Sequence, residues 1–509
     1  MNNTLQRGYA AIQARNLPEA VRCFEEALHD DPDNAQALAW LGQALCSLGR
    51  RVEGHARLRQ CGRIQIRNAE ASRDIRHALE IAQLMQQWVD FEGALELLTR
   101  AVEINGTEFR GQQLLAVTLA QLNRKNEALE AGRRALALAP DLAMMQVLMA
   151  SLEADAGLNA EARQRLETIL AGQPGDREAF RAHKEMARVL DKLKMYDQVF
   201  SHLHASGRLA ARLPEYSQQD RNLLPNAIRA NTAGFDRELM GRWSDSEFPE
   251  GLPPPIFVIG FFRSGTTLTQ EVLGVHPEIF VADETGFISA MQRELQRMDP
   301  ASASDAERLR KLDLQGILRL RAFYWKTVRD RFGDEIGQRR LVDKHTMNTV
   351  DVGLINTVFP DARLLFVMRD PRDVCISCFM QLMVPSPATA HLQTLQDTAA
   401  FYAQVMDWWT HVKPLLTMDC LEFRYEDAVA EFEPTFRGVF DFLGLSWDPE
   451  AVNFHKYAAR KHVASPSRNQ VAQPLYASSL ARWRRYAGEL SSVAETLAPC
   501  VRRFGYEAD

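Results

Sequence analysis

The stretch that decides the fold of the second half of the chain reads Ile256-Phe257-Val258-Ile259-Gly260-Phe261-Phe262-Arg263-Ser264-Gly265-Thr266-Thr267. Its apolar start, which ends at Gly260, predicts a buried strand. Leu268, Val272 and Leu273 then fall on one face of a predicted helix. Gly260 and Gly265 have the GxxxxG spacing of a loop that wraps a phosphate. Strand, loop and helix in this order aim backbone N–H groups and a helix N-terminus at an anion.

The loop departs at one position from the nucleoside-triphosphate pattern GxxxxGK[ST]. Thr266 stands where the lysine would reach the β- and γ-phosphates, and the cation of the loop is Arg263. The segment 262–268 instead resembles the 5′-phosphosulfate loop of sulfotransferases, most closely that of protein-tyrosine sulfotransferases and their bacterial relatives. These enzymes use 3′-phosphoadenosine 5′-phosphosulfate (PAPS) as co-substrate. The resemblance implies that the 5′-phosphosulfate is held by Arg263, Ser264, Gly265, Thr266 and Thr267.

A second buried-strand pattern, residues 364–368, runs into Arg369-Asp370-Pro371-Arg372-Asp373-Val374 and a helical stretch through Ser377. This resembles the 3′-phosphate site of the family, which implies that Arg369 and Ser377 hold that phosphate. The residue types suit the task, because a guanidinium offers phosphate oxygens a planar fork and a hydroxyl adds a further donor. Two motifs in the family's order make the interpretation specific.

Three later segments extend the resemblance to about residues 250–509. Tyr425, in Phe423-Arg424-Tyr425-Glu426-Asp427, matches the tyrosine that contacts the adenine. Ser467 and Gln473 lie in a segment that resembles the loop closing over the cofactor, although tyrosine sulfotransferases carry a lysine where Gln473 stands. Trp483 fits the same C-terminal pattern, and a packing role for it is at least as well supported as a ligand role.

Sulfonate transfer needs a base for the acceptor proton and cations for the charge that builds on the leaving phosphate. The resemblance implies that Glu284 is the base and that Lys344 and Arg263 are the cations. Asp283 and Glu284 could equally cap the next helix. Small-molecule sulfotransferases use a histidine, so His276 and His345 are alternatives, with His276 at a turn before a proline.

No metal is expected, since the cations take the place of magnesium in this interpretation. Cys375 and Cys378 form a single CxxC pattern without a second ligand pair, and we interpret them as small buried residues.

The first part of the chain carries a repeat and no catalytic motif. Small and apolar residues recur with the roughly 34-residue period of tetratricopeptide repeats, whose paired helices approach closely. The positions are Ala20, Phe24, Ala27 and Pro32; Ala94, Leu98 and Ala101; Ala128, Gly132, Ala135 and Pro140; and Ala162, Leu166, Ile169 and Pro174. Gly54, Leu58 and Cys61 read as a degenerate copy followed by an insertion, and residues 197–205 as a last, weak one. We predict about five or six repeats in a right-handed α-solenoid.

The predicted fold class is α plus α/β. A tetratricopeptide α-solenoid over residues 1–215 precedes a polar, proline-rich linker over 216–255 and a P-loop-type α/β domain with a central parallel sheet over 256–509. Such repeats offer a concave face that can hold a peptide or protein acceptor. A scaffold or homodimerisation role for the repeats is the other reading, and the sequence does not rank the two.

Composition bounds the class of protein. The charged fraction of 25% and the hydrophobic fraction of 46% are those of a soluble globular protein. The net charge of −6 gives no case for nucleic-acid binding. The start of the chain lacks the apolar core of a signal peptide, and no apolar stretch is long enough to span a membrane. The 7 cysteines are scattered and do not form a disulfide framework. We therefore expect a cytoplasmic protein.

The sequence thus predicts a PAPS-dependent sulfotransferase that acts on an acceptor hydroxyl. A peptide tyrosine, a sugar hydroxyl, a lipid and a small phenol all remain open as acceptors. One alternative is a nucleotide-dependent P-loop kinase, against which Thr266 argues. The other is a repeat scaffold whose second domain binds a nucleotide without turnover.

Overall fold

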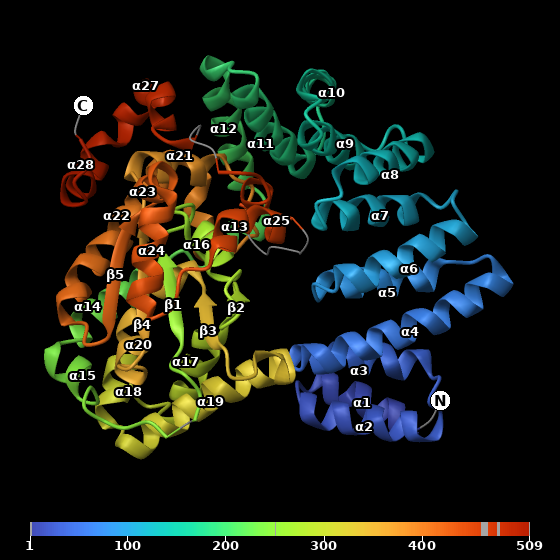
Figure 1. Cartoon of the computed structure of the whole chain (residues 1–509). Coiled ribbons are helices and arrows are strands. Elements are labelled where there is room, and N and C mark those ends of the chain that lie inside the picture. Colours follow the sequence, from blue (N-terminus) through green and yellow to red (C-terminus); the bar gives the residue numbers. More distant parts are fainter. Residues whose placement is uncertain (1–2, 250, 460–466, 476–478, 508–509) are drawn as a thin grey trace. The chain divides into compact units, whose positions relative to one another are not determined.

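The computed structural model describes residues 3–249, 251–459, 467–475 and 479–507 (Figure 1). Contacts divide the chain into two compact units. The first is Met1–Gly172 with Lys326–Glu335, and the second is Gln173–Trp325 with Ile336–Asp509.

Consecutive helices pack in pairs in the first unit. They are α1 (Asn3–Gln13), α2 (Leu17–Asp30), α3 (Ala35–Ser47), α4 (Arg51–Ser72), α5 (Arg76–Gln87), α6 (Phe91–Ile104), α7 (Phe109–Gln121), α8 (Lys125–Leu138), α9 (Ala143–Asp155) and α10 (Asn159–Ala171). The predicted small and apolar repeat positions lie on the second helix of each pair, and the predicted prolines follow its end. Phe24 on α2 and Ala128 on α8, for example, are fully buried. The degenerate copy is α4, which has 22 residues against 14 in α2 because of its insertion. The predicted helical repeat region is confirmed.

The second unit contains a five-stranded sheet with the order β2-β3-β1-β4-β5, in which every neighbouring pair is parallel. The strands are β1 (Ile256–Gly260), β2 (Ile279–Asp283), β3 (Arg340–Lys344), β4 (Arg363–Met368) and β5 (Asp419–Arg424). All of β1 is buried, as its continuous apolar run predicts for a central strand covered on both faces. The predicted α/β domain with a central parallel sheet is confirmed.

Helices surround this sheet. They are α11 (Asp176–Lys192), α12 (Tyr196–Ala210), α13 (Pro214–Ser217), α14 (Leu223–Gly234), α15 (Arg237–Gly241), α16 (Thr266–Leu273), α17 (Phe287–Met298), α18 (Asp305–Lys311), α19 (Leu314–Phe332), α20 (Val352–Val358), α21 (Pro371–Met380), α22 (Leu395–Val412), α23 (Tyr425–Ala430), α24 (Phe432–Leu443), α25 (Phe454–Ala458), α26 (Arg468–Val471), α27 (Ala487–Leu490) and α28 (Ala494–Arg503). Figure 1 shows the helices around the strands.

Alternate residues of β1 pack into different layers. Ile256 and Val258 join a cluster with α16 and α24 on one face of the sheet. Phe257, on the other face, contacts Tyr324 of α19 and Phe359, which follows α20. The sheet therefore has a hydrophobic core on each face. A functional site can form at the ends of the strands, where the faces are not covered.

The predicted linker, residues 216–255, contains the helices α14 and α15, and α13 overlaps its first residues. Their polar composition hid buried positions such as Ile228 and Asn231 on α14. The burial of Asn231 leaves its amide satisfied, because Nδ2 donates a hydrogen bond of 2.8 Å to the Val350 carbonyl oxygen.

Among the described residues, no helix is long and apolar enough to cross a membrane.

Two helix glycines with opposite surroundings test the packing of the second unit. A Cβ at Gly207 of α12 would lie 2.4 Å from the backbone oxygen of Gln393, whereas a Cβ at Gly438 of α24 would meet nothing within 4 Å. We expect Gly207→Ala to destabilise the fold by about 1–3 kcal/mol. Gly438→Ala should be neutral or stabilise by up to about 1 kcal/mol, because alanine is the better helix former. Thermal unfolding midpoints check this, and equal midpoints for both variants would contradict the packing of α12.

Candidate functional site

The loop after β1 joins the strand to α16 through two residues in the left-handed region, Arg263 (φ 65°) and Gly265 (φ 112°). Gly265 caps the N-terminus of α16. A Cβ at Gly265 would lie 2.6 Å from the Tyr425 ring, so the ring packs directly on the loop backbone and only glycine fits there. Ser264 is buried, and its hydroxyl oxygen has no hydrogen-bond partner among the described residues.

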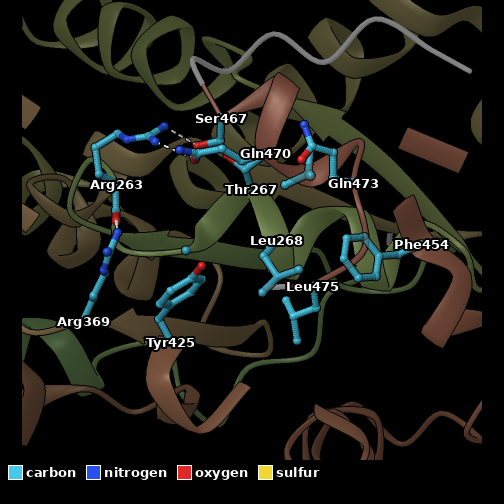
Figure 2. Close-up of a pocket in the computed structure, with 12 residues that line it drawn as sticks. Arg263, Thr267, Leu268, Arg369, Tyr425, Phe454, Ser467, Gln470, Gln473 and Leu475 are labelled. Carbon is cyan, nitrogen blue, oxygen red and sulfur yellow. Dashed lines mark hydrogen bonds between the residues drawn. The ribbon is translucent and has the colours of Figure 1, made fainter. Parts of the chain in front are cut away.

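The guanidinium of Arg263 reaches across to segments far away in the sequence. Its Nε donates a hydrogen bond of 3.0 Å to the Ser377 hydroxyl on α21, and its Nη2 donates one of 2.6 Å to Gln470 Oε1. Nη1 donates to the Ser467 hydroxyl. These acceptors are neutral oxygen atoms, so the cation is held in place by groups that an anion could replace (Figure 2).

A second guanidinium, that of Arg369 after β4, lies against the backbone of the Arg263 loop. Its Nη1 donates a hydrogen bond of 3.1 Å to the Arg263 carbonyl oxygen, and its Nη2 donates one of 2.7 Å to the Ser479 carbonyl oxygen. Its carbon Cζ lies 4.9 Å from the centre of the Tyr425 ring. Arg369 is buried, and its Nε has no hydrogen-bond partner in the described part of the chain. The Tyr425 hydroxyl in turn lies 3.0 Å from the Ser479 hydroxyl.

These side chains share one pocket, drawn in Figure 2. Its lining consists of Arg263, Gly265, Thr267, Leu268, Arg369, Tyr425, Phe454, Ser467, Gln470, Val471, Gln473 and Leu475. The lining thus includes most of the residues that the sequence assigned to the cofactor. Ser377 borders it through Arg263, while Ser264 and Thr266 are buried in the loop and the first turn of α16. Two guanidiniums, an aromatic ring and apolar side chains suit a ligand with phosphate groups and a flat base.

Glu284 and Lys344 do not line this pocket; they pair with each other at the ends of β2 and β3. Lys344 Nζ lies 2.5 Å from Glu284 Oε1 and 3.4 Å from Asp283 Oδ1. The lysine side chain is 1% exposed and that of Glu284 is 28% exposed. Burial works to lower the pKa of Lys344, but the two carboxylates outweigh it and the pKa is raised. The pair is therefore a buried, charged ammonium beside a carboxylate that solvent can reach.

The two histidine alternatives have different surroundings. His276 is buried, and its Nδ1 accepts a hydrogen bond from the Glu278 N–H, which fixes a turn. His345 lies near the candidate base, with its Nε2 3.9 Å from Glu284 Oε2. Burial lowers the pKa of His345, so its ring is neutral near pH 7. Only His345 is placed where it could exchange a proton with Glu284.

Asp373, Gln470 and Ser479 contact predicted site residues but carried no signal of their own in the sequence. Asp373 on α21 lies 3.8 Å from Arg369, and its Oδ1 accepts a hydrogen bond of 2.7 Å from the Trp483 N–H. Trp483 itself is buried, and the centre of its ring lies 3.6 Å from Arg372 Cζ. These contacts give Trp483 a packing role.

Cys375 and Cys378 are fully buried, as predicted. Burial raises the pKa of Cys378 to about 12 and that of Cys375 well above its ordinary value. Within the described ranges, no group of three or more His, Cys, Asp and Glu side chains could hold a metal ion.

Comparison with known proteins shows what the chain is similar to. Residues 254–449 match the model of the sulfotransferase family, and residues 5–53 match a tetratricopeptide-repeat model. An "Uncharacterized protein" of Aquifex aeolicus (strain VF5) is 28% identical over 415 residues, which cover 79% of this chain and 52% of that protein. The match thus spans about half the length of that relative.

Two further comparisons each cover about half of the chain. Protein-tyrosine sulfotransferase A of Caenorhabditis elegans is 25% identical over 267 residues, 50% of this chain and 67% of that protein. The solved sulfotransferase domain from the Synechococcus PCC 7002 olefin synthase is 19% identical, with a TM-score of 0.33, and covers 47% of this chain and 90% of that domain. The resemblance to sulfotransferases with tetratricopeptide repeats is confirmed by the two family models.

The carboxyl of Asp373 should make stability depend on pH. Burial raises its pKa to about 6, although Arg369 and the Trp483 N–H act in the opposite direction. Because the pKa in the folded state is above the ordinary value, the stability that the protonated form contributes is lost as pH rises toward and through about 6. Asp373→Asn is neutral at every pH and keeps an acceptor for Trp483. We expect its stability relative to wild type to be greater at pH 7.5 than at pH 4 by about 2–3 kcal/mol. Unfolding midpoints across this range test the prediction, and parallel pH profiles would refute it.

Proposed function

Because residues 254–449 carry a sulfotransferase-family domain, we propose that this chain transfers the sulfonate group of PAPS to an acceptor hydroxyl. The observation that supports this most strongly is the meeting of Arg263 and Arg369 in one pocket beside the Tyr425 ring. PAPS has anionic groups on the 3′ and 5′ positions of its ribose and a flat adenine, and the pocket offers two cations and an aromatic face. The unpartnered Ser264 hydroxyl and Arg369 Nε are further donors that fit such a ligand.

The loop 263–267 would hold the 5′-phosphosulfate through its backbone N–H groups, the N-terminus of α16 and Arg263. Arg369 and the Ser377 hydroxyl would hold the 3′-phosphate. The hydrogen bond between Arg263 and Ser377 supports this, because it brings the hydroxyl to the edge of the same pocket. Tyr425 would stack on the adenine, and Ser467 and Gln473 would close the pocket from the other side.

In the proposed reaction the acceptor oxygen forms a bond to sulfur while the bond from sulfur to the 5′-phosphate oxygen breaks. The acceptor proton goes to Glu284, and 3′-phosphoadenosine 5′-phosphate leaves. Lys344 binds Oε1 of Glu284, so in this proposal Oε2 takes the proton. Arg263 and Lys344 would stabilise the charge on the leaving phosphate, as positioned cations do in related group transfers.

Two observations bear on the identity of the acceptor. The relative from Caenorhabditis elegans is a protein-tyrosine sulfotransferase, and repeat arrays commonly hold polypeptides, so a peptide tyrosine is our first choice. A cytoplasmic location and a role of the repeats in holding the acceptor protein are parts of the same proposal. The kinase alternative is disfavoured because Thr266 replaces the lysine that contacts β- and γ-phosphates.

Calorimetric titration of the purified chain with 3′-phosphoadenosine 5′-phosphate, beside ATP and without magnesium, tests the cofactor class. We expect binding of the bisphosphate and none of ATP. Arg369→Ala should then weaken bisphosphate binding by roughly 10- to 100-fold, because a charged hydrogen bond to phosphate is lost. Adenosine 5′-phosphosulfate, which lacks the 3′-phosphate, should lose far less.

Arg437→Ala is the matched control, since Arg437 is an exposed residue of α24 paired with Glu433. Equal losses for the two nucleotides would refute the assignment of Arg369 to the 3′-phosphate. Magnesium-dependent ATP binding in place of bisphosphate binding would make the kinase alternative the better interpretation.

Glu284→Gln tests the base. The amide keeps the shape of the side chain but cannot take the acceptor proton, so we expect normal bisphosphate binding and a rate of sulfonate transfer lower by roughly a hundredfold or more. Glu278→Gln makes the same chemical change at the exposed residue before β2 and should leave the rate unchanged. Transfer by Glu284→Gln at the wild-type rate would show that another group, with His345 as the nearest candidate, is the base.

A further inference from the structure

One aspartate of the helix pair α11–α12 holds the segment that completes the cofactor pocket. Asp191 is near the end of α11, and its Oδ2 lies 2.8 Å from Arg482 Nη2. Its Oδ1 accepts a hydrogen bond of 2.5 Å from the Tyr486 hydroxyl. The side chains of Asp191 and Arg482 are only 15% and 20% exposed, so water competes weakly for this contact.

The segment 479–486 connects this aspartate to the pocket over a few residues. At one end, the carbonyl oxygen of Ser479 accepts a hydrogen bond from Arg369. The Ser479 hydroxyl lies 3.0 Å from the Tyr425 hydroxyl. At the other end, Arg482 and Tyr486 are bound to Asp191. The segment is therefore fixed both at the pocket and on α11.

The same helix pair also supports the helix that carries Ser377. The buried Lys184 of α11 donates a hydrogen bond of 2.5 Å to the carbonyl oxygen of Phe379, in the last turn of α21. Phe200 of α12 packs against the rings of Phe379 and Tyr486, with centroids 5.9 and 5.3 Å apart. Two separate parts of the pocket are thus held by α11 and α12.

We propose that Asp191 is a positioning residue for cofactor binding, which acts by holding the segment 479–486 against Arg369 and Tyr425. This inference rests on the proposed function, because the ligand it concerns is 3′-phosphoadenosine 5′-phosphate and its sulfonated form. Asp191 touches neither the pocket nor the reacting atoms. Its effect should therefore fall on affinity for the cofactor and leave the chemical step unchanged.

Asp191→Asn tests the inference, because it removes the charge that holds Arg482 and keeps the size of the side chain. We expect the Kd for 3′-phosphoadenosine 5′-phosphate and the KM for PAPS to rise by about tenfold or more, with kcat changed less than about twofold. Asp176→Asn is the control. Asp176 lies on α11, as Asp191 does, and the substitution breaks only an exposed ion pair with Arg212, so all three values should stay at wild type.

The outcomes separate the two proposals. Wild-type protein that does not bind the bisphosphate refutes the proposed function. Wild-type protein that binds it while Asp191→Asn binds equally well refutes only the positioning role. A lower kcat with unchanged Kd and KM would also refute it, since that pattern indicates a smaller folded fraction. If Asp191→Asn does not fold, Tyr486→Phe removes one hydrogen bond alone; its Kd should rise about threefold, and an unchanged Kd would overturn the inference.

Discussion

The parallel pairing of β1 with β3 and β4 is the constraint on which the site depends. Since neighbouring strands run in the same direction, their carboxyl ends meet at one edge of the sheet. Gly260 lies opposite Val367, Asp283 lies opposite Lys344, and Met368 lies opposite Arg424. The chain leaves β1 towards β2 on one side, whereas β4 lies on the other side. Ligands of open α/β sheets bind at such a reversal of strand order, and the loop of Arg263 is placed there.

The charge of the pocket is local and is set by geometry. The whole chain has a net charge of −6, yet Arg263 and Arg369 both line the pocket. Each guanidinium donates to neutral oxygens, such as Ser377 for Arg263 and the Ser479 carbonyl for Arg369, and the Asp373 carboxyl lies 3.8 Å from Arg369. A phosphate group would replace neutral acceptors by anionic ones, and hydrogen bonds of that kind are about twice as strong. The arrangement therefore favours an anionic ligand without the need for a basic protein.

The sequence predicted those parts of the site that lie within one strand, loop and helix. The run 256–267 and the segment from 364 to Ser377 are local patterns, so their strands and helices were predicted correctly. The contact between Asp191 and Tyr486 joins residues far apart in the chain and leaves no periodic pattern in either segment. Ser479 was missed for the same reason, because it meets Arg369 through its backbone carbonyl, which any residue could supply. The direct pairing of Glu284 with Lys344 depends on the order of β2 and β3 in the sheet, which motif matching does not give.

That pairing raises a question about the proposed chemistry, since protonation of Glu284 would take an anionic partner away from the buried Lys344. Asp283 provides an answer. Its Oδ1 lies 3.4 Å from Lys344 Nζ, so the buried lysine keeps an anionic partner when Glu284 becomes neutral. A buried ammonium without any partner would be costly, and the proton transfer would then have to bear that cost. In the proposed reaction, Asp283 would let Glu284 accept a proton through Oε2 while Lys344 stays charged and able to stabilise a leaving phosphate. On this proposal, two adjacent acids at the end of β2 allow one of them to change its charge while the other does not.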